Sequence, residues 1–189
     1  MKADRTAIGD AGLTVEEFER LPEEDLYRVE LVRGVLVREP RPAAYHGWVQ
    51  VGLGGALLNH VREHGLGFVF TDIGVILERE PDTVRGPDIA FVVADRLPGG
   101  PPKKGFLEFA PDLCVEIVSP SNRLTEIQAK VFEYLDAGTR LCWIVNPEPR
   151  TVTSYRSRTD VGLADATGEI DGDDVVPGFR LAVAELFSP

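Results

Sequence analysis

Two carboxylates and a lysine stand out in this chain because they are the groups that a metal-dependent phosphodiester hydrolase needs. Asp88 and Glu116 each lie in an apolar, β-branched stretch, and Lys130 follows in the next amphipathic segment. Carboxylate oxygens are the ligands that Mg²⁺ prefers, and a lysine can stabilise negative charge on a reacting phosphate. We therefore take Asp88, Glu116 and Lys130 as the candidate catalytic residues.

Two predicted strands must position the acids. Residues 88–93 form an apolar run after a Gly-Pro break, so Asp88 stands at the entrance of a buried strand. A second apolar run, 112–118, carries Glu116 among residues that should be buried. Because an isolated buried charge is too costly, Glu116 must be paired, hydrogen-bonded or bound to metal.

A predicted helix over residues 123–137 must position the lysine. Glu126, Lys130 and Tyr134 recur every four residues and share one face. The plain alternative is an exposed salt bridge between Glu126 and Lys130. Considered together with Asp88 and Glu116, these three residues favour a second interpretation, in which they form a polar helix face that lines a cleft. The neighbouring apolar face, spaced three or four residues apart, consists of Leu124, Ile127, Val131 and Leu135.

The remaining pattern predicts a mixed α/β plan. The expected elements are a helix from Thr14, a hairpin around Gly34, a long helix over 46–64, two strands within 68–77, strands at 141–145 and 151–155, a weak hairpin within 160–178, and a last helix over 183–187.

Ordered motifs along almost the whole chain carry a resemblance to a known family. The matching segments are 27–34 (YRVELVRG), similar to "YELVDG"; 86–92 (GPDIAFV), similar to "RPDVAFV"; 112–121 (DLCVEIVSPS), similar to "DLVVEVLSPS"; 130–134 (KVFEY), similar to "KLALY"; and 138–147 (GTRLCWIVNP), similar to "GV.EYWIVDP". On these motifs the sequence is identified as a member of the Uma-two family of bacterial endonucleases, which have the PD-(D/E)XK nuclease fold. The resemblance implies an α/β, restriction-endonuclease-like fold with a central mixed β-sheet flanked by helices.

The resemblance also implies roles for single residues. Asp88 and Glu116 match metal ligands of the family, and Lys130 matches its catalytic lysine. In the parent motif the lysine comes two residues after the second acid, a position that holds Val118 here. Many members of the fold supply the lysine from the following helix instead, and Lys130 fits that arrangement.

Three further residues are supporting candidates. Glu30 matches an acid of the first hairpin and would be a further metal ligand. His46 stands where a histidine commonly precedes the first long helix, and it faces either the cleft or the surface. Glu126 stands where the family usually has Asp, which leaves open whether it acts as a ligand or positions water.

These assignments give a hypothesis for the chemistry. One or two Mg²⁺ or Mn²⁺ ions on Asp88, Glu116 and Glu30 would bind a phosphate oxygen of DNA and polarise an attacking water. Without a cation the gathered carboxylates would repel one another, and a bound Mg²⁺ would relieve that repulsion. A homodimer is compatible with the fold, because two active sites are needed to cut both strands.

Length and hydropathy place the chain in a broad class. A length of 189 residues predicts one domain over 1–189, and the resemblance implies that this domain is restriction-endonuclease-like. No apolar run approaches the about 20 residues that span a bilayer. The N-terminus does not resemble a signal peptide, so the cytoplasm is the expected location.

The formal net charge of −11 argues against ordinary DNA binding, since Lys and Arg supply most non-specific affinity for phosphates. Two alternatives therefore remain, a nuclease-fold protein that acts as a binding or scaffold module without catalysis, and a hydrolase of small phosphorylated molecules. A basic groove at the acids would favour DNA, and a closed pocket would favour a small substrate. Eight residues could form a basic rim, namely Arg62, Arg79, Arg85, Arg96, Lys103, Lys104, Arg123 and Arg140.

Overall fold

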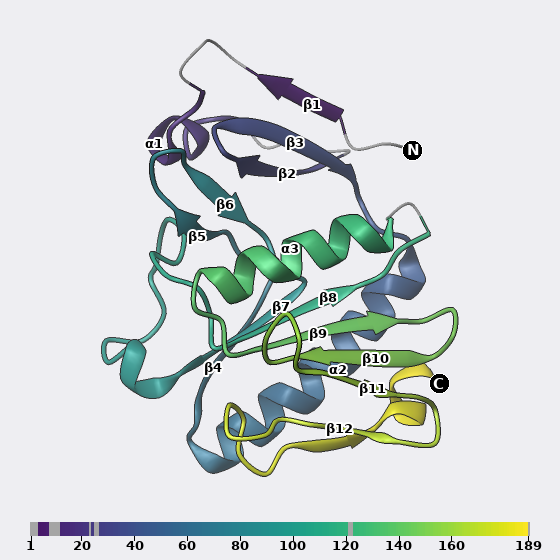
Figure 1. Cartoon of the computed structure of the whole chain (residues 1–189). Helices are drawn as coiled ribbons and strands as arrows, with labels where there is room; N and C mark the ends of the chain where they lie inside the picture. The colour runs from purple at the N-terminus through teal and green to yellow at the C-terminus, as the bar shows by residue number, and fades with distance from the viewer. Residues whose placement is uncertain (1–3, 8–11, 23, 25–26, 121–122, 189) are drawn as a thin grey trace.

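The computed structural model describes residues 4–7, 12–22, 24, 27–120 and 123–188. A mixed six-stranded sheet lies between two helices, and an antiparallel five-stranded sheet adjoins it (Figure 1). The mixed α/β architecture with a central mixed sheet confirms the expected fold class.

The six-stranded sheet has the order β11-β10-β9-β8-β7-β4. Strands β8 and β9 pair in parallel, and the other neighbours are antiparallel. The helix between β8 and β9 makes the crossover that a parallel pair requires. The strands are β4 Gly67–Thr71, β7 Ile89–Val93, β8 Leu113–Ile117, β9 Leu141–Asn146, β10 Thr151–Tyr155 and β11 Val161–Ala164.

The five-stranded sheet has the order β1-β3-β2-β6-β5 and is antiparallel throughout. A further pair, β12 Glu169–Asp171 and β13 Arg180–Ala182, forms a separate two-stranded sheet. The strands of the larger sheet are β1 Asp4–Ala7, β2 Tyr27–Val32, β3 Val35–Pro40, β5 Val75–Glu78 and β6 Thr83–Arg85.

Two helices cover opposite faces of the six-stranded sheet. Helix α2, Ala44–His64, packs Val49, Leu53, Leu57 and Val61 against one face. Helix α3, Leu124–Asp136, packs Ile127, Val131 and Tyr134 against the other. The short segments are α1 Val15–Phe18 and the 3₁₀ turns η1 Ala94–Arg96 and η2 Val183–Phe187.

Strand alternation decides which face each side chain of β8 reaches. Leu113, Val115 and Ile117 point to the α2 side, where they join its core cluster. Cys114 joins the cluster on the α3 side, and Glu116 shares its parity. The predicted buried strand therefore delivers Glu116 to the face that α3 covers.

Several expected elements differ in detail. Leu124 is exposed in the first turn of α3 instead of belonging to the buried stripe. The hairpin expected within 160–178 does not form, because β11 pairs with β10 and β12 pairs with β13. Strands β1 and β6 were not expected, and the last helix is the 3₁₀ turn η2.

No helix in the described part of the chain is both long and apolar enough to cross a bilayer.

Candidate active site

Five segments bring five ionisable side chains together at the end of the central sheet where β7 begins and β8 ends. Asp88 immediately precedes β7, and Glu116 lies on β8. Lys130 lies on α3, Glu30 on β2 and His46 on α2. Each of the five is at most 6% exposed. Groups of this kind are tolerated in an interior only when they are paired, so their contacts define the site.

Lys130 is the centre of the cluster. Its Nζ lies 3.0 Å from Glu116 Oε1 and 2.8 Å from Glu30 Oε1. It also donates to the carbonyl oxygen of Gly86 at 3.2 Å. The alternative interpretation, an exposed salt bridge between Glu126 and Lys130, is wrong, because Lys130 is buried while Glu126 is exposed.

Asp88 is held by hydrogen-bond donors on both carboxylate oxygens. Its Oδ2 accepts from the backbone N–H of Ile117 at 2.7 Å and lies 3.1 Å from His46 Nε2. Its Oδ1 accepts from Arg28. Burial alone would raise the pKa of Asp88, but His46 and Arg28 bring it down to about 2. His46 is therefore buried against Asp88, which excludes the surface position that was one of the two alternatives for this residue.

Glu30 is fixed by a second arginine. Arg85 Nη1 donates to Glu30 Oε2 at 2.7 Å, and the N–H of Gly86 donates to Oε1 at 2.8 Å. Burial opposes ionisation, yet Lys130 and Arg85 lower the pKa of Glu30 to about 2. The pairing of Leu31 with Val84 brings β6 beside β2 and so sets Arg85 next to Glu30.

The pKa of Glu116 is shifted in the opposite direction from those of Asp88 and Glu30. Burial raises its pKa to about 8 even though Lys130 lowers it, since Asp88 and Glu30 add negative charge nearby. Tyr134 donates its hydroxyl to Glu116 Oε1 at 2.8 Å. A further cation beside Glu116 would favour the ionised carboxylate.

Basic side chains of the protein offset most of the repulsion expected among the acids. Arg28 contacts Asp88, and Arg85 contacts Glu30. Lys130 contacts both Glu30 and Glu116. The sequence analysis did not include Arg28, and it placed Arg85 in a basic rim instead of beside Glu30. Arg28 lies two residues before Glu30 and shares its strand face, which is a period-two signal that could have found it. Arg85 gives no such signal, because its strand has only three residues.

The acids fit a Mg²⁺ ion only in part. Lys130 occupies the space between Glu30 and Glu116, so Glu30 is not placed as the third ligand that we expected. No three His, Cys, Asp or Glu side chains among the described residues are arranged as a metal site. Mg²⁺ commonly binds through one or two carboxylates plus water and substrate phosphate, and the hard oxygens of Asp88 and Glu116 fit that mode.

The basic rim does not form as expected. Four of its eight candidates bind acids, Arg79 to Glu16, Arg85 to Glu30, Arg96 to Asp112 and Arg140 to Asp174. Arg62 lies in the last turn of α2, about 24 Å along the helix from His46 at 1.5 Å per residue. Lys103 and Lys104 are exposed. Within the described ranges, half of the candidate rim is thus paired with acids, which weakens the case for a basic groove that binds duplex DNA.

A cavity of about 570 Å³ adjoins the cluster, and we call it the site cavity. Glu30, Arg85 and Lys130 line its inner end, with Arg28 and Gln50 beside them. Gln50 donates to the backbone oxygen of Asp88 at 2.8 Å and so fixes the entrance of β7. Of the three catalytic candidates, Lys130 lines this cavity, whereas Asp88 and Glu116 lie behind its lining.

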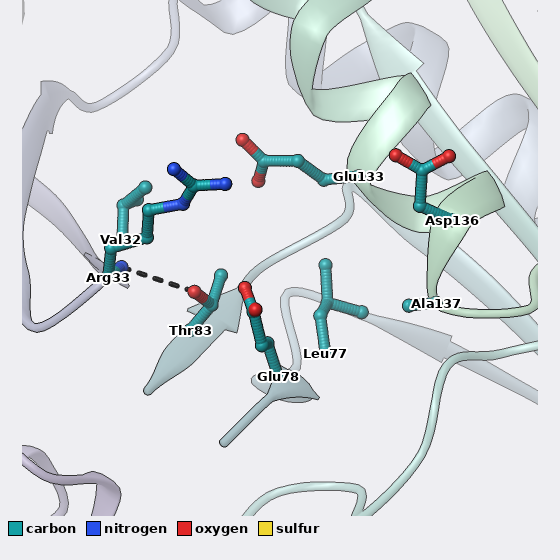
Figure 2. Close-up of a pocket in the computed structure, with 8 residues that line it drawn as sticks. All are labelled: Val32, Arg33, Leu77, Glu78, Thr83, Glu133, Asp136 and Ala137. Atoms are coloured by element: carbon teal, nitrogen blue, oxygen red, sulfur yellow. Dashed lines mark hydrogen bonds between the residues drawn. The ribbon is translucent and has the colours of Figure 1, made fainter. Parts of the chain in front are cut away.

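A second cavity, of about 340 Å³, lies among residues of β2, β5, β6 and α3. Arg85 reaches toward it by donating to both carboxylate oxygens of Glu133, at 2.7 and 2.9 Å. None of the predicted site residues lines it. Figure 2 shows its lining, Val32, Arg33, Leu77, Glu78, Thr83, Glu133, Asp136 and Ala137.

The fold has a counterpart among solved structures. The structure is similar to a solved structure described as a "putative nuclease belonging to DUF820 from Anabaena variabilis ATCC 29413". The TM-score is 0.80 at 23% sequence identity, over 93% of this chain and 97% of that one. No curated protein matches the chain significantly.

The chain belongs to the Uma2 family, described as "Putative restriction endonuclease", whose family model matches residues 15–184. This membership confirms the resemblance drawn from the sequence motifs.

Proposed function

We propose that this protein is a metal-dependent endonuclease that hydrolyses DNA phosphodiester bonds. The observation that carries the proposal is the contact of Lys130 with Glu116 in a buried cluster that also holds Asp88. Such groups are rarely buried together without a function, and membership in the Uma2 family favours a nuclease.

The residues of the cluster have separable roles in this proposal. Asp88 and Glu116 would hold Mg²⁺ or Mn²⁺, which when bound would polarise the phosphate and activate water. His46 and the N–H of Ile117 fix the carboxylate of Asp88. Lys130 would stabilise negative charge on the reacting phosphate. Glu30 positions Lys130 through its 2.8 Å contact.

Glu126 has the least structural support among the residues proposed for the site. It lies one turn before Lys130 on α3, but its side chain is exposed. A role as a metal ligand would require it to turn toward the buried cluster. Its replacement by Gln serves as a test of that role.

A hydrolase of small phosphorylated molecules is the second candidate function. The site cavity favours it, because a volume of about 570 Å³ lies within the range of about 300–1,000 Å³ typical of small-ligand pockets. The pairing of Arg79, Arg96 and Arg140 with acids also weakens the case for long duplex DNA.

The first experiment compares cleavage of plasmid and single-stranded DNA by the wild type and by Asp88→Asn. We expect cleavage that depends on Mg²⁺ or Mn²⁺ and is lost in the variant, which keeps the shape of the side chain. Low salt makes a weak electrostatic encounter with DNA easier to detect. A wild type that cleaves neither DNA with either metal would overturn the nuclease proposal and leave the small-substrate or binding function.

A homodimer remains a prediction for cleavage of both strands. Light scattering at several protein concentrations tests it. Trp48 is 41% exposed on the outer side of α2, and Trp48→Ala shows whether that face joins two copies. A monomer that still cuts both strands would contradict the prediction.

A further inference from the structure

The site cavity continues beyond the charged cluster to an aromatic wall. Phe18 and Phe106 line it, and their rings stack with centroids 5.6 Å apart and planes at 29°. Val29 and Val84 line the same part of the cavity. Its inner end is therefore charged, while its far part offers apolar and aromatic surface.

The aromatic wall is held in place before any ligand binds. A Cβ atom at Gly74 would overlap the ring of Phe106, so the ring lies directly against the backbone there. Phe106 also packs with the core cluster that contains Leu31 and Val84. A preformed aromatic surface loses little freedom when a flat ligand stacks on it.

Charged side chains of both signs line the cavity, namely Arg28, Arg41, Arg85 and Lys130 with Glu19, Glu24, Glu30, Glu39 and Asp72. Arg28, Arg85 and Lys130 are paired with acids, and Lys130 is the group that we propose to contact the reacting phosphate. Glu39, which is half-buried, lines the cavity and makes no side-chain hydrogen bond that is seen within the described ranges. A carboxylate oxygen in such a place can accept from the exocyclic amino group of a nucleobase.

We propose that the site cavity binds one nucleotide, with its base against the wall of Phe18 and Phe106 and its phosphate at Lys130. This inference rests on the proposed function and names its substrate class. A base within a duplex is stacked and paired, so it cannot reach the wall unless it leaves the helix. The protein therefore acts on unpaired nucleotides, either within a strand or free in solution.

Binding of adenosine 5′-monophosphate in the presence of Mg²⁺, measured by isothermal titration calorimetry, tests the pocket without requiring cleavage. We expect Phe106→Ala to raise the dissociation constant by roughly tenfold, as loss of a base–aromatic contact does. Ribose 5-phosphate, which has no base, should bind equally to the wild type and the variant. Leu77→Ala is the matched control, because Leu77 lines the second cavity (Figure 2).

Two further variants keep the test decisive if Phe106→Ala unfolds. Tyr27→Ala removes a partly exposed ring that lines the cavity. Gly74→Ala adds a methyl group that displaces the ring of Phe106. Weakened nucleotide binding in folded forms of either variant supports the pocket, and unchanged binding in both overturns it.

The source of the nucleotide is decided by comparing substrates. A single-stranded oligonucleotide that is cleaved faster than its duplex, with a KM raised by the pocket variants, indicates a base within a strand. Tight binding of the mononucleotide with no cleavage of any DNA indicates that the natural ligand is a free nucleotide. That result supports the nucleotide pocket and overturns the nuclease proposal. Metal-dependent DNA cleavage that the pocket variants leave unchanged overturns the pocket alone.

Discussion

Arg28 contacts two carboxylates at once, donating from Nη1 to Asp88 and pairing through Nη2 with Asp72. Asp88 is buried, whereas the side chain of Asp72 is half-exposed. The guanidinium thus neutralises the same carboxylate that we propose as a metal ligand. A metal ion on Asp88 must compete with Arg28, which can retain Asp72 as its partner.

The first prediction concerns this competition. Arg28→Gln should tighten binding of Mn²⁺ by roughly tenfold, because removal of a nearby positive charge favours a cation on Asp88. Isothermal titration of metal into the nucleotide-free protein measures the effect. Arg79→Gln, which removes an exposed arginine paired with Glu16, should leave the affinity unchanged. Equal affinities for the wild type and Arg28→Gln would refute the competition.

The second prediction concerns the ammonium group at the centre of the cluster. Lys130→Met leaves Glu30 and Glu116 without their shared partner, and we expect it to lower the free energy of unfolding by about 3–5 kcal/mol. Combining it with Glu30→Gln should restore part of the loss, because Glu30, whose pKa is about 2, is the carboxylate left charged and without Lys130. Urea unfolding of both variants gives the values.

Glu126→Gln is the control on the same helix. Its side chain is exposed, so we expect a change within about 0.5 kcal/mol and nearly full activity. A large loss of metal-dependent activity in Glu126→Gln would show that this residue does act on the metal or its water. Stability of Lys130→Met close to that of the wild type would show that the buried pairs contribute little.

The strongest sequence signals concerned individual strands and helices. Asp88 and Glu116 could be assigned to buried strands because each lies in an apolar run, and Lys130 to a helix by its spacing. Their mutual contacts depend on how β7, β8 and α3 pack, which a local pattern does not contain. Arg85 was misjudged as a rim residue, because its pairing with Glu30 depends on a three-residue strand.

The third prediction is a stability maximum in mildly acidic solution for the metal-free protein. Asp88 and Glu30 have pKa values of about 2, lowered from 3.8 and 4.5, so their stabilisation is lost as the pH falls from about 4.5 toward 2. Glu116 has its pKa raised to about 8, so its contribution is full below about 4.5 and is lost as the pH rises through 8.

Thermal unfolding between about pH 2 and pH 9 measures both limbs of that profile. Glu30→Gln should flatten the acidic limb, and Glu116→Gln should flatten the alkaline limb. Added Mg²⁺ should reduce the alkaline loss if it binds Glu116. A wild-type profile that is flat from about 4.5 to 8 would contradict the unusual pKa of Glu116.

The cluster joins residues that are far apart in the chain. Sixty positions separate Arg28 from Asp88, and 55 separate Glu30 from Arg85. Lys130 completes the arrangement from a helix that is synthesised after all of them. Because contacts of this range form only when most of a domain is present, a chain still emerging from the ribosome holds no assembled cluster. Synthesis itself therefore delays any hydrolytic activity until α3 has folded onto the sheet.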